Sequence, residues 1–232
     1  MKAVILAGGE GKRLRPYTHI LPKPLLPIGE TPIIEIIIKR LKEKGIKDFF
    51  ILTNYKSDLF EIILGNGSKL GVNITYLKEK TPLGTAGPLK NLEENLDGNF
   101  IVINGDVLTD LDFGELLKFH EDNNSLITIT IKKEKIRLDY GMIKSEGHYV
   151  TGWDEKPVIE ADISTGIYVL NSSIIKYIEK DEKIDMPDLI KRIIGLGVSK
   201  ILKFIYEGKW IDIGRIENYE EAIQKDLGQF KD

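Results

Sequence analysis

The sequence contains no cysteine, which excludes disulfide bonds, thiolate zinc sites and cysteine nucleophiles. Its three histidines, His19, His120 and His148, have no metal-ligand spacing, so we expect each to be structural or exposed. No apolar run approaches the length of a membrane span. The apolar stretch at residues 3–7 is too short for a signal peptide, and we therefore expect a cytoplasmic protein without a membrane partner.

An excess of charge of one sign is also missing. The 232 residues carry a net charge of −3, with 30% charged and 42% hydrophobic side chains. This composition is typical of a globular protein that is long enough to bury a substantial core. The charge balance gives no reason to expect nucleic acid or an anionic membrane as a partner.

The most informative segment lies near the N-terminus, where an apolar run ends in Gly8, Gly9 and Gly11 and three cations follow. A further cation, Lys23, lies between two prolines. Glycines let the backbone approach phosphate closely, and backbone N–H groups in such turns bind anions. A guanidinium such as that of Arg13 can grip two phosphate oxygens. The segment therefore predicts a site for a nucleoside triphosphate.

Two common phosphate-binding loops do not fit this segment. A P-loop needs Gly-x-x-x-x-Gly-Lys followed by serine or threonine, but Leu6 replaces the first glycine and Arg13 follows the lysine. A dinucleotide-binding loop needs Gly-x-Gly-x-x-Gly, but Leu14 replaces the third glycine. The missing glycine also disfavours a nicotinamide oxidoreductase.

The remaining chain alternates strand-like and helix-like segments. Residues 2–6 and 100–103 predict buried strands, residues 32–44 predict a helix, and residues 85–96 predict another helix entered by glycines. This alternation predicts an α/β fold, a Rossmann-like three-layer α/β/α sandwich with a mixed, mainly parallel central sheet. From Tyr140 onward, shorter strands predict a mixed or antiparallel extension. Ligands of such sheets bind at the carboxyl ends of the strands.

Residues 6–14 read Leu-Ala-Gly-Gly-Glu-Gly-Lys-Arg-Leu and are followed by Pro22-Lys23-Pro24. These two motifs resemble the signature of the sugar-1-phosphate nucleotidyltransferases, also called nucleotide-sugar pyrophosphorylases. The resemblance is strongest to catalytic domains of the mannose-1-phosphate guanylyltransferase and glucose-1-phosphate thymidylyltransferase type. It implies one catalytic domain over residues 1–232, with a nucleotide-binding half at about 1–110 and a sugar-phosphate-binding half at about 111–232.

The resemblance implies that Arg13 and Lys23 are catalytic and that Glu79 meets the edge of the nucleobase. A carboxylate suits the adjacent N–H donors of guanine, which favours GTP, whereas thymine or uracil would fit a glutamine better. The glycine-rich segment 83–87 is implied to form the nucleobase pocket. The nucleotide-binding residues implied in this way are Leu6, Ala7, Gly8, Gly9, Gly11, Glu79, Gly84 and Thr85.

Two aspartates are candidates for metal binding. Asp106 directly follows an apolar strand, and Asp212 lies in a segment that resembles the family's Trp-x-Asp-x-Gly motif. The resemblance implies that both hold Mg²⁺, a hard cation that prefers carboxylate and phosphate oxygens, with Mn²⁺ left open. For Asp106, the alternative role is to cap a helix, which the nearby Asp110 and Asp112 could do as well.

Glu155-Lys156-Pro157 resembles the family's Glu-Lys-Pro motif, whose glutamate binds sugar hydroxyls and whose lysine binds the sugar phosphate. Without the motif, the two charges would be interpreted as a solvated pair. The sugar-phosphate-binding residues implied by the resemblance are Gly141, Glu155, Lys156 and Thr165. Ser164 stands where mannose-type enzymes often have asparagine, and this departure counts against mannose 1-phosphate itself.

The implied activity is that of an enzyme of class EC 2.7.7.-, which transfers a nucleotidyl group from a nucleoside triphosphate to a sugar 1-phosphate and releases pyrophosphate. GTP with mannose 1-phosphate or a related sugar is favoured, and dTTP or UTP with glucose 1-phosphate is the alternative. A non-catalytic nucleotide-sugar-binding regulatory protein is an alternative of another class. Such proteins usually lose a phosphate-gripping or metal-binding residue, whereas this chain keeps all of those implied here. A homo-oligomer is left open.

Overall fold

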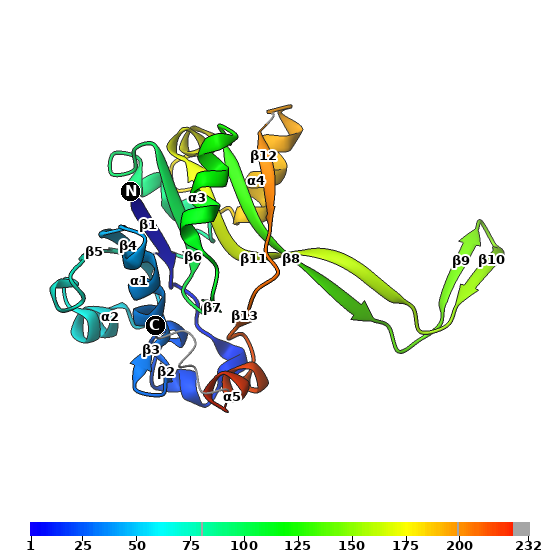
Figure 1. Ribbon diagram of the computed structural model, residues 1–232, viewed down its shortest axis with the longest axis horizontal. Coiled ribbons are helices and arrows are strands. Elements are labelled where there is room, and N and C mark those ends of the chain that lie inside the picture. The colour runs from blue at the N-terminus through cyan, green and yellow to red at the C-terminus, as the bar shows by residue number, and fades with distance from the viewer. Residues whose placement is uncertain (80, 199, 225–232) are drawn as a thin grey trace.

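The computed structural model (Figure 1) describes residues 1–79, 81–198 and 200–224. Its central sheet consists of β1 (Lys2–Leu6), β4 (Asp48–Thr53), β5 (Asn73–Lys78), β6 (Asn99–Asn104), β8 (Ile127–Arg137), β11 (Val158–Asn171) and β12 (Ile201–Ile205). The strand order is β12-β8-β11-β6-β1-β4-β5. β1 runs parallel to β4 and β6, whereas β11 runs antiparallel to β6 and β8. The predicted mixed, mainly parallel sheet is therefore confirmed.

Helices cover both faces of this sheet. The helices α1 (Ile33–Glu43), α2 (Ser57–Leu64), α3 (Phe113–Asp122) and α5 (Ile216–Gln224) share one hydrophobic core. The helix α4 (Met186–Gly195) and the 3₁₀ helices η5 (Gly87–Leu92) and η6 (Ser172–Tyr177) share the other. Successive side chains of a strand point to opposite faces, so Ala3 and Ile5 of β1 join the first core and Val4 joins the second. The predicted three-layer α/β/α sandwich is confirmed.

The helix expected over residues 85–96 is wrong in extent and type, because only Gly87–Leu92 is helical and it is a 3₁₀ helix. The carbonyl of Ile184 accepts the N–H groups of Ala86 and Gly87 at 3.0 and 3.1 Å. A Cβ on Gly87 would lie 2.3 Å from the carbonyl oxygen of Glu182. This close contact with a distant segment sets the backbone conformation, overriding local helix propensity.

Short elements connect the strands and helices of the main layers. Three 3₁₀ helices follow β1: η1 (Lys12–Leu14), η2 (Tyr17–His19) and η3 (Lys23–Leu25). The two-residue strands β2 (Pro27–Ile28) and β3 (Thr31–Pro32) pair with each other, and η4 (Ser68–Leu70) precedes β5. The pair that matters for the site is β7 (Val107–Thr109) with β13 (Trp210–Asp212), because it brings the C-terminal part of the chain to the end of β6.

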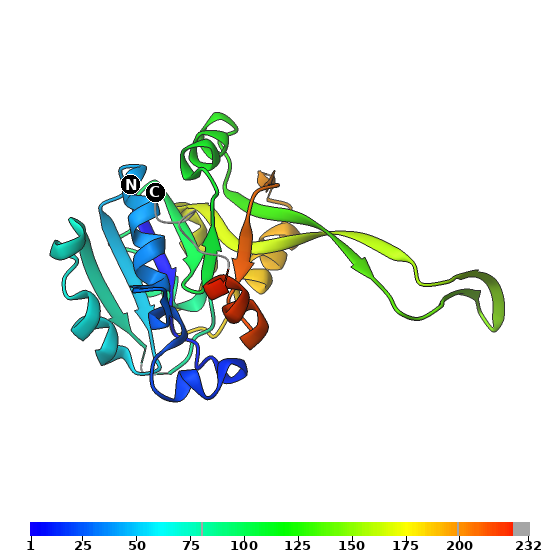
Figure 2. The same cartoon turned by 60° about the horizontal axis from the view of Figure 1, so that its bottom comes forward.

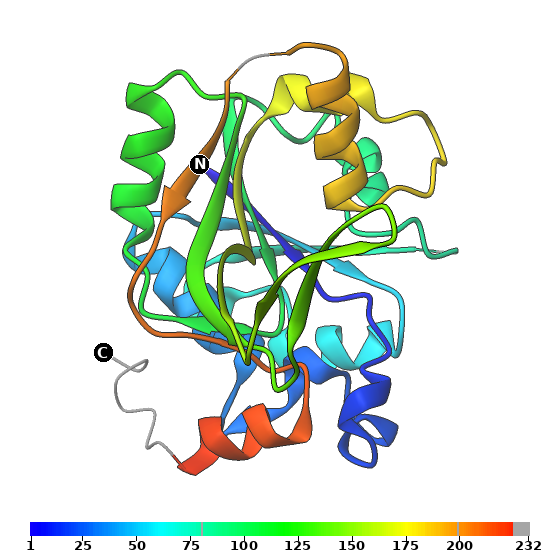
Figure 3. The same ribbon diagram turned by 90° about the vertical axis from the view of Figure 1, so that its right-hand side faces the viewer.

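β8 and β11 continue beyond the sheet as a two-stranded ribbon, which carries the hairpin of β9 (Met142–Glu146) and β10 (Tyr149–Asp154). We call residues 132–164 the arm. Figures 1 and 2 show it projecting far from the layered body, and Figure 3 shows the molecule from the side on which the arm projects. β8 has the same direction as β6 and β1, because β11 is antiparallel to both β8 and β6. The arm therefore leaves the sheet at the edge where β1 and β6 end.

Among the described residues, the structure contains no helix with the length and apolar character needed to span a membrane.

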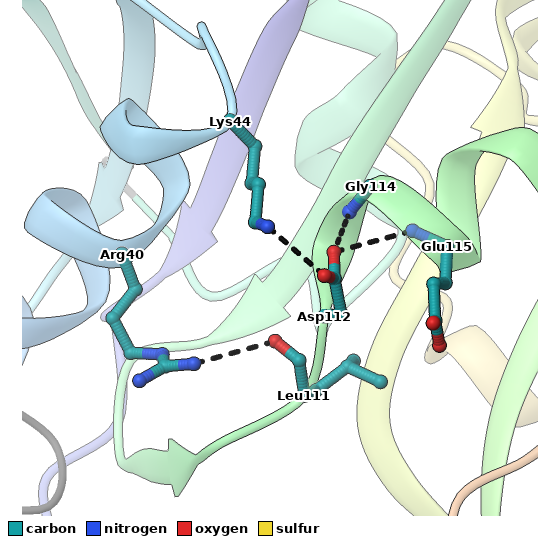
Figure 4. Close-up of polar contacts among 6 residues, drawn as sticks. All are labelled: Arg40, Lys44, Leu111, Asp112, Gly114 and Glu115. Atoms are coloured by element: carbon teal, nitrogen blue, oxygen red, sulfur yellow. Dashed lines mark hydrogen bonds and ion pairs between the residues drawn. The ribbon is translucent and has the colours of Figure 1, made fainter.

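Figure 4 shows how the N-terminus of α3 is tied to α1. Asp112 caps α3, and its Oδ1 accepts the N–H of Gly114 at 2.7 Å. Its Oδ2 lies 3.0 Å from Lys44, and this hydrogen bond lowers the pKa of Asp112. Arg40 of α1 donates to the carbonyl of Leu111 at 3.5 Å. Of the aspartates considered as helix caps, Asp112 performs this role.

We expect Asp112→Ala to lower the free energy of unfolding by about 1 kcal/mol, because the cap of α3 is lost. Urea unfolding at neutral pH measures the change. Asp122→Ala, at the other end of α3, is the matched control and should change stability by less than about 0.5 kcal/mol. Because the pKa of Asp112 is lowered in the folded state, its contribution should disappear as pH falls through that pKa. Equal losses in the two variants would contradict the capping role.

Candidate functional site

A cavity of about 580 Å³ opens at the carboxyl edge of the parallel strands, within the range of small-molecule sites. It contains all the residues that the sequence predicts to bind a nucleotide, together with Arg13, Lys23 and Asp106. The lining residues are Leu6, Ala7, Gly8, Gly9, Glu10, Gly11, Lys12, Arg13, Lys23, Pro24, Leu52, Glu79, Pro82, Gly84, Thr85, Pro88, Asn104, Asp106 and Gly214.

The glycine loop after β1 is compact because its backbone meets other chain segments closely. Gly11 has φ +61°, and a Cβ there would lie 2.8 Å from Cγ2 of Thr18. The Thr18 hydroxyl also donates to the Gly11 carbonyl at 3.0 Å. Gly9, in the same loop, would meet nothing within 4 Å. Gly11 thus shapes the turn, whereas Gly9 leaves space on the side of the cavity.

Glu79 reaches the glycine loop from the end of β5. Its Oε1 accepts the N–H of Leu83 at 3.0 Å, and a Cβ on Gly8 would lie 3.1 Å from its Oε2. Burial raises the pKa of Glu79, and the hydrogen bond from Leu83 acts in the opposite direction. The carboxylate is therefore held beside the glycine loop, where an acceptor suits a ligand with N–H donors.

The segment around Gly84 and Thr85 is positioned by Asp185, which sequence reasoning missed. Asp185 Oδ1 accepts the backbone N–H and the hydroxyl of Thr85 at 2.9 and 3.2 Å. The Thr85 hydroxyl in turn accepts the N–H of Met186 at 2.7 Å. Gly84 has φ +81°, and a Cβ there would lie 2.6 Å from the carbonyl oxygen of Ile184. The hydrogen bonds of the Thr85 side chain thus stabilise the loop. No local sequence motif identifies Asp185 as its partner.

Opposite charges meet at the floor of the cavity. Lys23 pairs with Asp106, and the two side chains are only 14% and 18% exposed. The Ile213 N–H donates to the Asp106 carbonyl at 3.0 Å, which places Asp212 beside this pair. Burial and the nearby Asp106 raise the pKa of Asp212, while Lys23 and Arg13 lower it. Two aspartates far apart in the sequence therefore share one electrostatic environment.

Asp106 and Asp212 offer the hard oxygen donors that Mg²⁺ prefers. Within the described ranges, no group of three or more histidine, cysteine, aspartate or glutamate side chains could hold a metal ion. Mg²⁺ commonly keeps waters and substrate phosphates in its octahedral shell and needs only one or two protein carboxylates. The two aspartates fit such an ion, with the remaining positions left to substrate and water.

The residues expected to bind the sugar phosphate do not line the cavity. Gly141 and Glu155 lie on the arm against Trp153, whose Nε1 donates to Glu155 Oε2 at 3.0 Å. Lys156 follows on the arm with φ 47°. Thr165 is buried, and its hydroxyl donates to the carbonyl of Thr130 at 2.9 Å. The structure thus brings together the residues predicted to bind the nucleotide, the two predicted catalytic residues and the two aspartates. It leaves the residues predicted to bind the sugar phosphate outside the cavity.

Asn104 and Gly214 are further lining residues that sequence reasoning did not single out as binding residues. A Cβ on Gly166 would lie 2.3 Å from Nδ2 of Asn104, so the asparagine packs directly against β11. Both lie within motifs recognised for their aspartates, which is the signal that could have identified them.

The chain matches the protein family described as "Nucleotidyl transferase" over residues 2–229. It is 39% identical to the mannose-1-phosphate guanyltransferase of Yarrowia lipolytica, covering 94% of this chain and 62% of the relative. It is 31% identical to the UTP–glucose-1-phosphate uridylyltransferase of Synechocystis sp., covering 97% and 63%. This chain therefore spans less than two thirds of the length of these relatives. The crystal structure of HddC from Yersinia pseudotuberculosis complexed with GMP-PN is similar at a TM-score of 0.73 and 26% identity, covering 97% of this chain and 98% of HddC.

We expect Gly11→Ala to destabilise the protein by about 1–2 kcal/mol, because alanine is strained at positive φ and its Cβ would press on Thr18. Gly9→Ala, in the same loop, is the matched control and should leave the unfolding midpoint nearly unchanged. Urea unfolding of both purified variants measures the difference. The proposed shape of the loop is wrong if Gly9→Ala is the more damaging change.

Proposed function

This chain belongs to the nucleotidyl transferase family, and on that premise we propose that it transfers a nucleotidyl group from a nucleoside triphosphate to a sugar 1-phosphate, releasing pyrophosphate. The observation that carries the proposal is the arrangement in one cavity of a glycine loop, Arg13 and the Lys23–Asp106 pair, with Asp212 beside that pair. A triphosphate needs anion-binding backbone and cations, and a divalent ion needs carboxylates.

GTP with mannose 1-phosphate or a related sugar is the favoured substrate pair. A relative named mannose-1-phosphate guanyltransferase and a similar structure complexed with GMP-PN support the guanine nucleotide. The Glu79 carboxylate beside Gly8 supports it as well, because adjacent N–H donors of guanine can bond to it. UTP or dTTP with glucose 1-phosphate is the alternative, which the relative named as a uridylyltransferase supports.

In the proposed reaction, an oxygen of the sugar phosphate attacks the α-phosphorus, and the bond to pyrophosphate breaks. The attacking oxygen is already anionic, so no general base is required. Arg13 would hold the β- and γ-phosphates and stabilise the charge on the leaving pyrophosphate. The glycine loop would orient the triphosphate through its backbone N–H groups. Catalysis is then mainly positioning and electrostatic stabilisation.

Lys23 and the two aspartates form the second part of the proposed mechanism. Mg²⁺, or Mn²⁺, held by Asp106 and Asp212 would supply positive charge at the α-phosphate. Lys23, which neutralises Asp106 in the structure, would exchange this carboxylate for a phosphate oxygen. Lys23, Asp106 and the glycine loop line the same cavity, so the lysine lies close to both the carboxylate and the proposed phosphate site.

The sugar-phosphate half of the proposed catalytic domain includes the arm. Glu155 would bind sugar hydroxyls, Lys156 would bind the sugar phosphate, and Gly141 would offer its backbone to a hydroxyl. The hydroxyl of Thr165 donates to the carbonyl of Thr130. Thr165 would therefore act by holding β11 against β8 at the root of the arm.

We expect pyrophosphate release to require both a nucleoside triphosphate and a sugar 1-phosphate in the presence of Mg²⁺. A grid of GTP, UTP, dTTP, ATP and CTP against mannose, glucose and heptose 1-phosphates measures this directly. GTP with mannose 1-phosphate or a related sugar should give the highest rate, because of Glu79. Binding of nucleotide sugars without any release across the grid would favour the regulatory alternative.

We expect Lys23→Ala and Asp106→Asn each to lower turnover by about a hundredfold or more, because each removes a charge at the reacting phosphates. Lys39→Ala and Asp58→Asn remove the same charges from exposed surface pairs and are the matched controls. Thermal unfolding must show that each variant is folded. Turnover near that of the wild type in a folded cavity variant would contradict the assigned role.

A further inference from the structure

The arm exposes apolar side chains to water. Tyr140, Tyr149, Val150 and Trp153 are 82%, 81%, 66% and 62% exposed. Ile136, Ile143, Val158 and Ile159 of the arm are exposed as well. Isolated two-stranded hairpins are marginally stable in water, and both edges of such a ribbon have unpaired backbone groups. A concentration of exposed apolar surface of this kind marks an interaction site.

The arm is held away from the cavity of its own chain. Seven consecutive residue pairs, from Ser164–Ile131 to Val158–Arg137, join β8 and β11 without a bulge. At about 3.3 Å per residue they extend for roughly 20 Å before the hairpin begins. The register shift in this ribbon lies at its root, between Ser164 and Tyr168. This ladder separates the hairpin from the body of its own chain in the structure.

The outer part of the arm and the cavity loop have net charges of opposite sign. The outer part, residues 138–157, contains four carboxylates and two lysines. The cavity loop at residues 10–15 contains one glutamate, one lysine and two arginines. Complementary charges orient two surfaces toward each other. The net negative charge of the outer part also disfavours nucleic acid or an anionic membrane as the surface on which it docks.

We propose that the arm of one copy docks on a second copy of this chain and places Glu155 and Lys156 at the cavity of that copy. The exchange is reciprocal, as in a twofold dimer, so each copy gives one arm and receives one. An interface of standard size uses roughly 20 to 30 residues a side, and the 33 residues of the arm (132–164) are enough to supply one side. The identity of the ligand bound by Glu155 and Lys156 rests on the proposed function, whereas the docking of the arm does not.

Crosslinking tests the docking without any activity measurement. Because the sequence has no cysteine, a chain with Glu155→Cys and a differently tagged chain with Glu10→Cys each carry a single thiol. After coexpression and tandem purification, we expect a short bismaleimide to join the two chains. Asp122→Cys, at the opposite end of the sheet, replaces Glu10→Cys in the control and should give no product. A third chain, which carries both cysteines, tests the alternative. Crosslinks within that chain, with no product between the two singly substituted chains, would overturn the proposal.

Complementation tests whether the docked arm completes the site. Arg13→Ala disables the cavity and Lys156→Ala disables the arm, so each variant alone should lose activity. The purified heterodimer has one intact cavity facing one intact arm, and we expect about half of the wild-type turnover. Inactive heterodimers would show that each arm serves its own chain, which overturns the inference and leaves the proposed function standing.

Full turnover of Lys156→Ala would overturn the role of the arm in the site. A wild-type protein that is inactive on the whole substrate grid would refute the proposed function instead. The crosslinking result would then still decide whether the arm docks on a second copy.

Discussion

The parallel pairing of β1 with β6 is the constraint on which the site depends. It sets Leu6 opposite Asn104, so the glycine loop and the segment that carries Asp106 leave the sheet side by side. The Gly105 N–H donates to the Leu6 carbonyl at 2.9 Å, and a Cβ on Gly105 would lie 3.0 Å from that oxygen. The loop that we propose to bind phosphate and the carboxylate that we propose to bind metal are thus joined through backbone contacts.

The charges at this edge stabilise one another only as a group. A carboxylate that is mostly removed from water is costly unless a cation accompanies it. Lys23 accompanies Asp106, and Asp212, whose pKa is raised by burial and by Asp106, lies near the same lysine and near Arg13, which lower that pKa. Two carboxylates and two cations therefore lie close together, and a divalent cation would add to the positive charge beside the aspartates. In the proposed function, the same cavity combines a backbone that binds anions with carboxylates that bind a cation.

In the proposed dimer, the arm links the candidate site of one copy to the second copy. It continues β8 past the edge at which the cavity opens, and it carries the Glu-Lys pair that the cavity lacks. Its apolar side chains named above are exposed among the described residues. A second copy would supply that cover and a cavity at the same time, so one interaction would stabilise the hairpin and complete the site.

The sequence alone determined the strands, the layers and most of the cavity. Alternation of apolar residues is a local pattern, and it predicted β1, β6 and the sandwich. The order of glycines and cations predicted a phosphate-binding loop, and the resemblance to the family implied the nucleotide-binding residues, from Leu6 to Thr85, that line the cavity. Only the tertiary structure decided that Asp106 and Asp212 lie close together and that Asp185 accepts the N–H of Thr85. It also decided that Gly87–Leu92 forms a 3₁₀ helix in place of an α-helix. The separation of Glu155 and Lys156 from the cavity is likewise a result of the tertiary structure. These features depend on contacts between segments distant in the chain, or on the direction of a ribbon as it leaves the sheet, and neither is recorded in a local pattern of residue types.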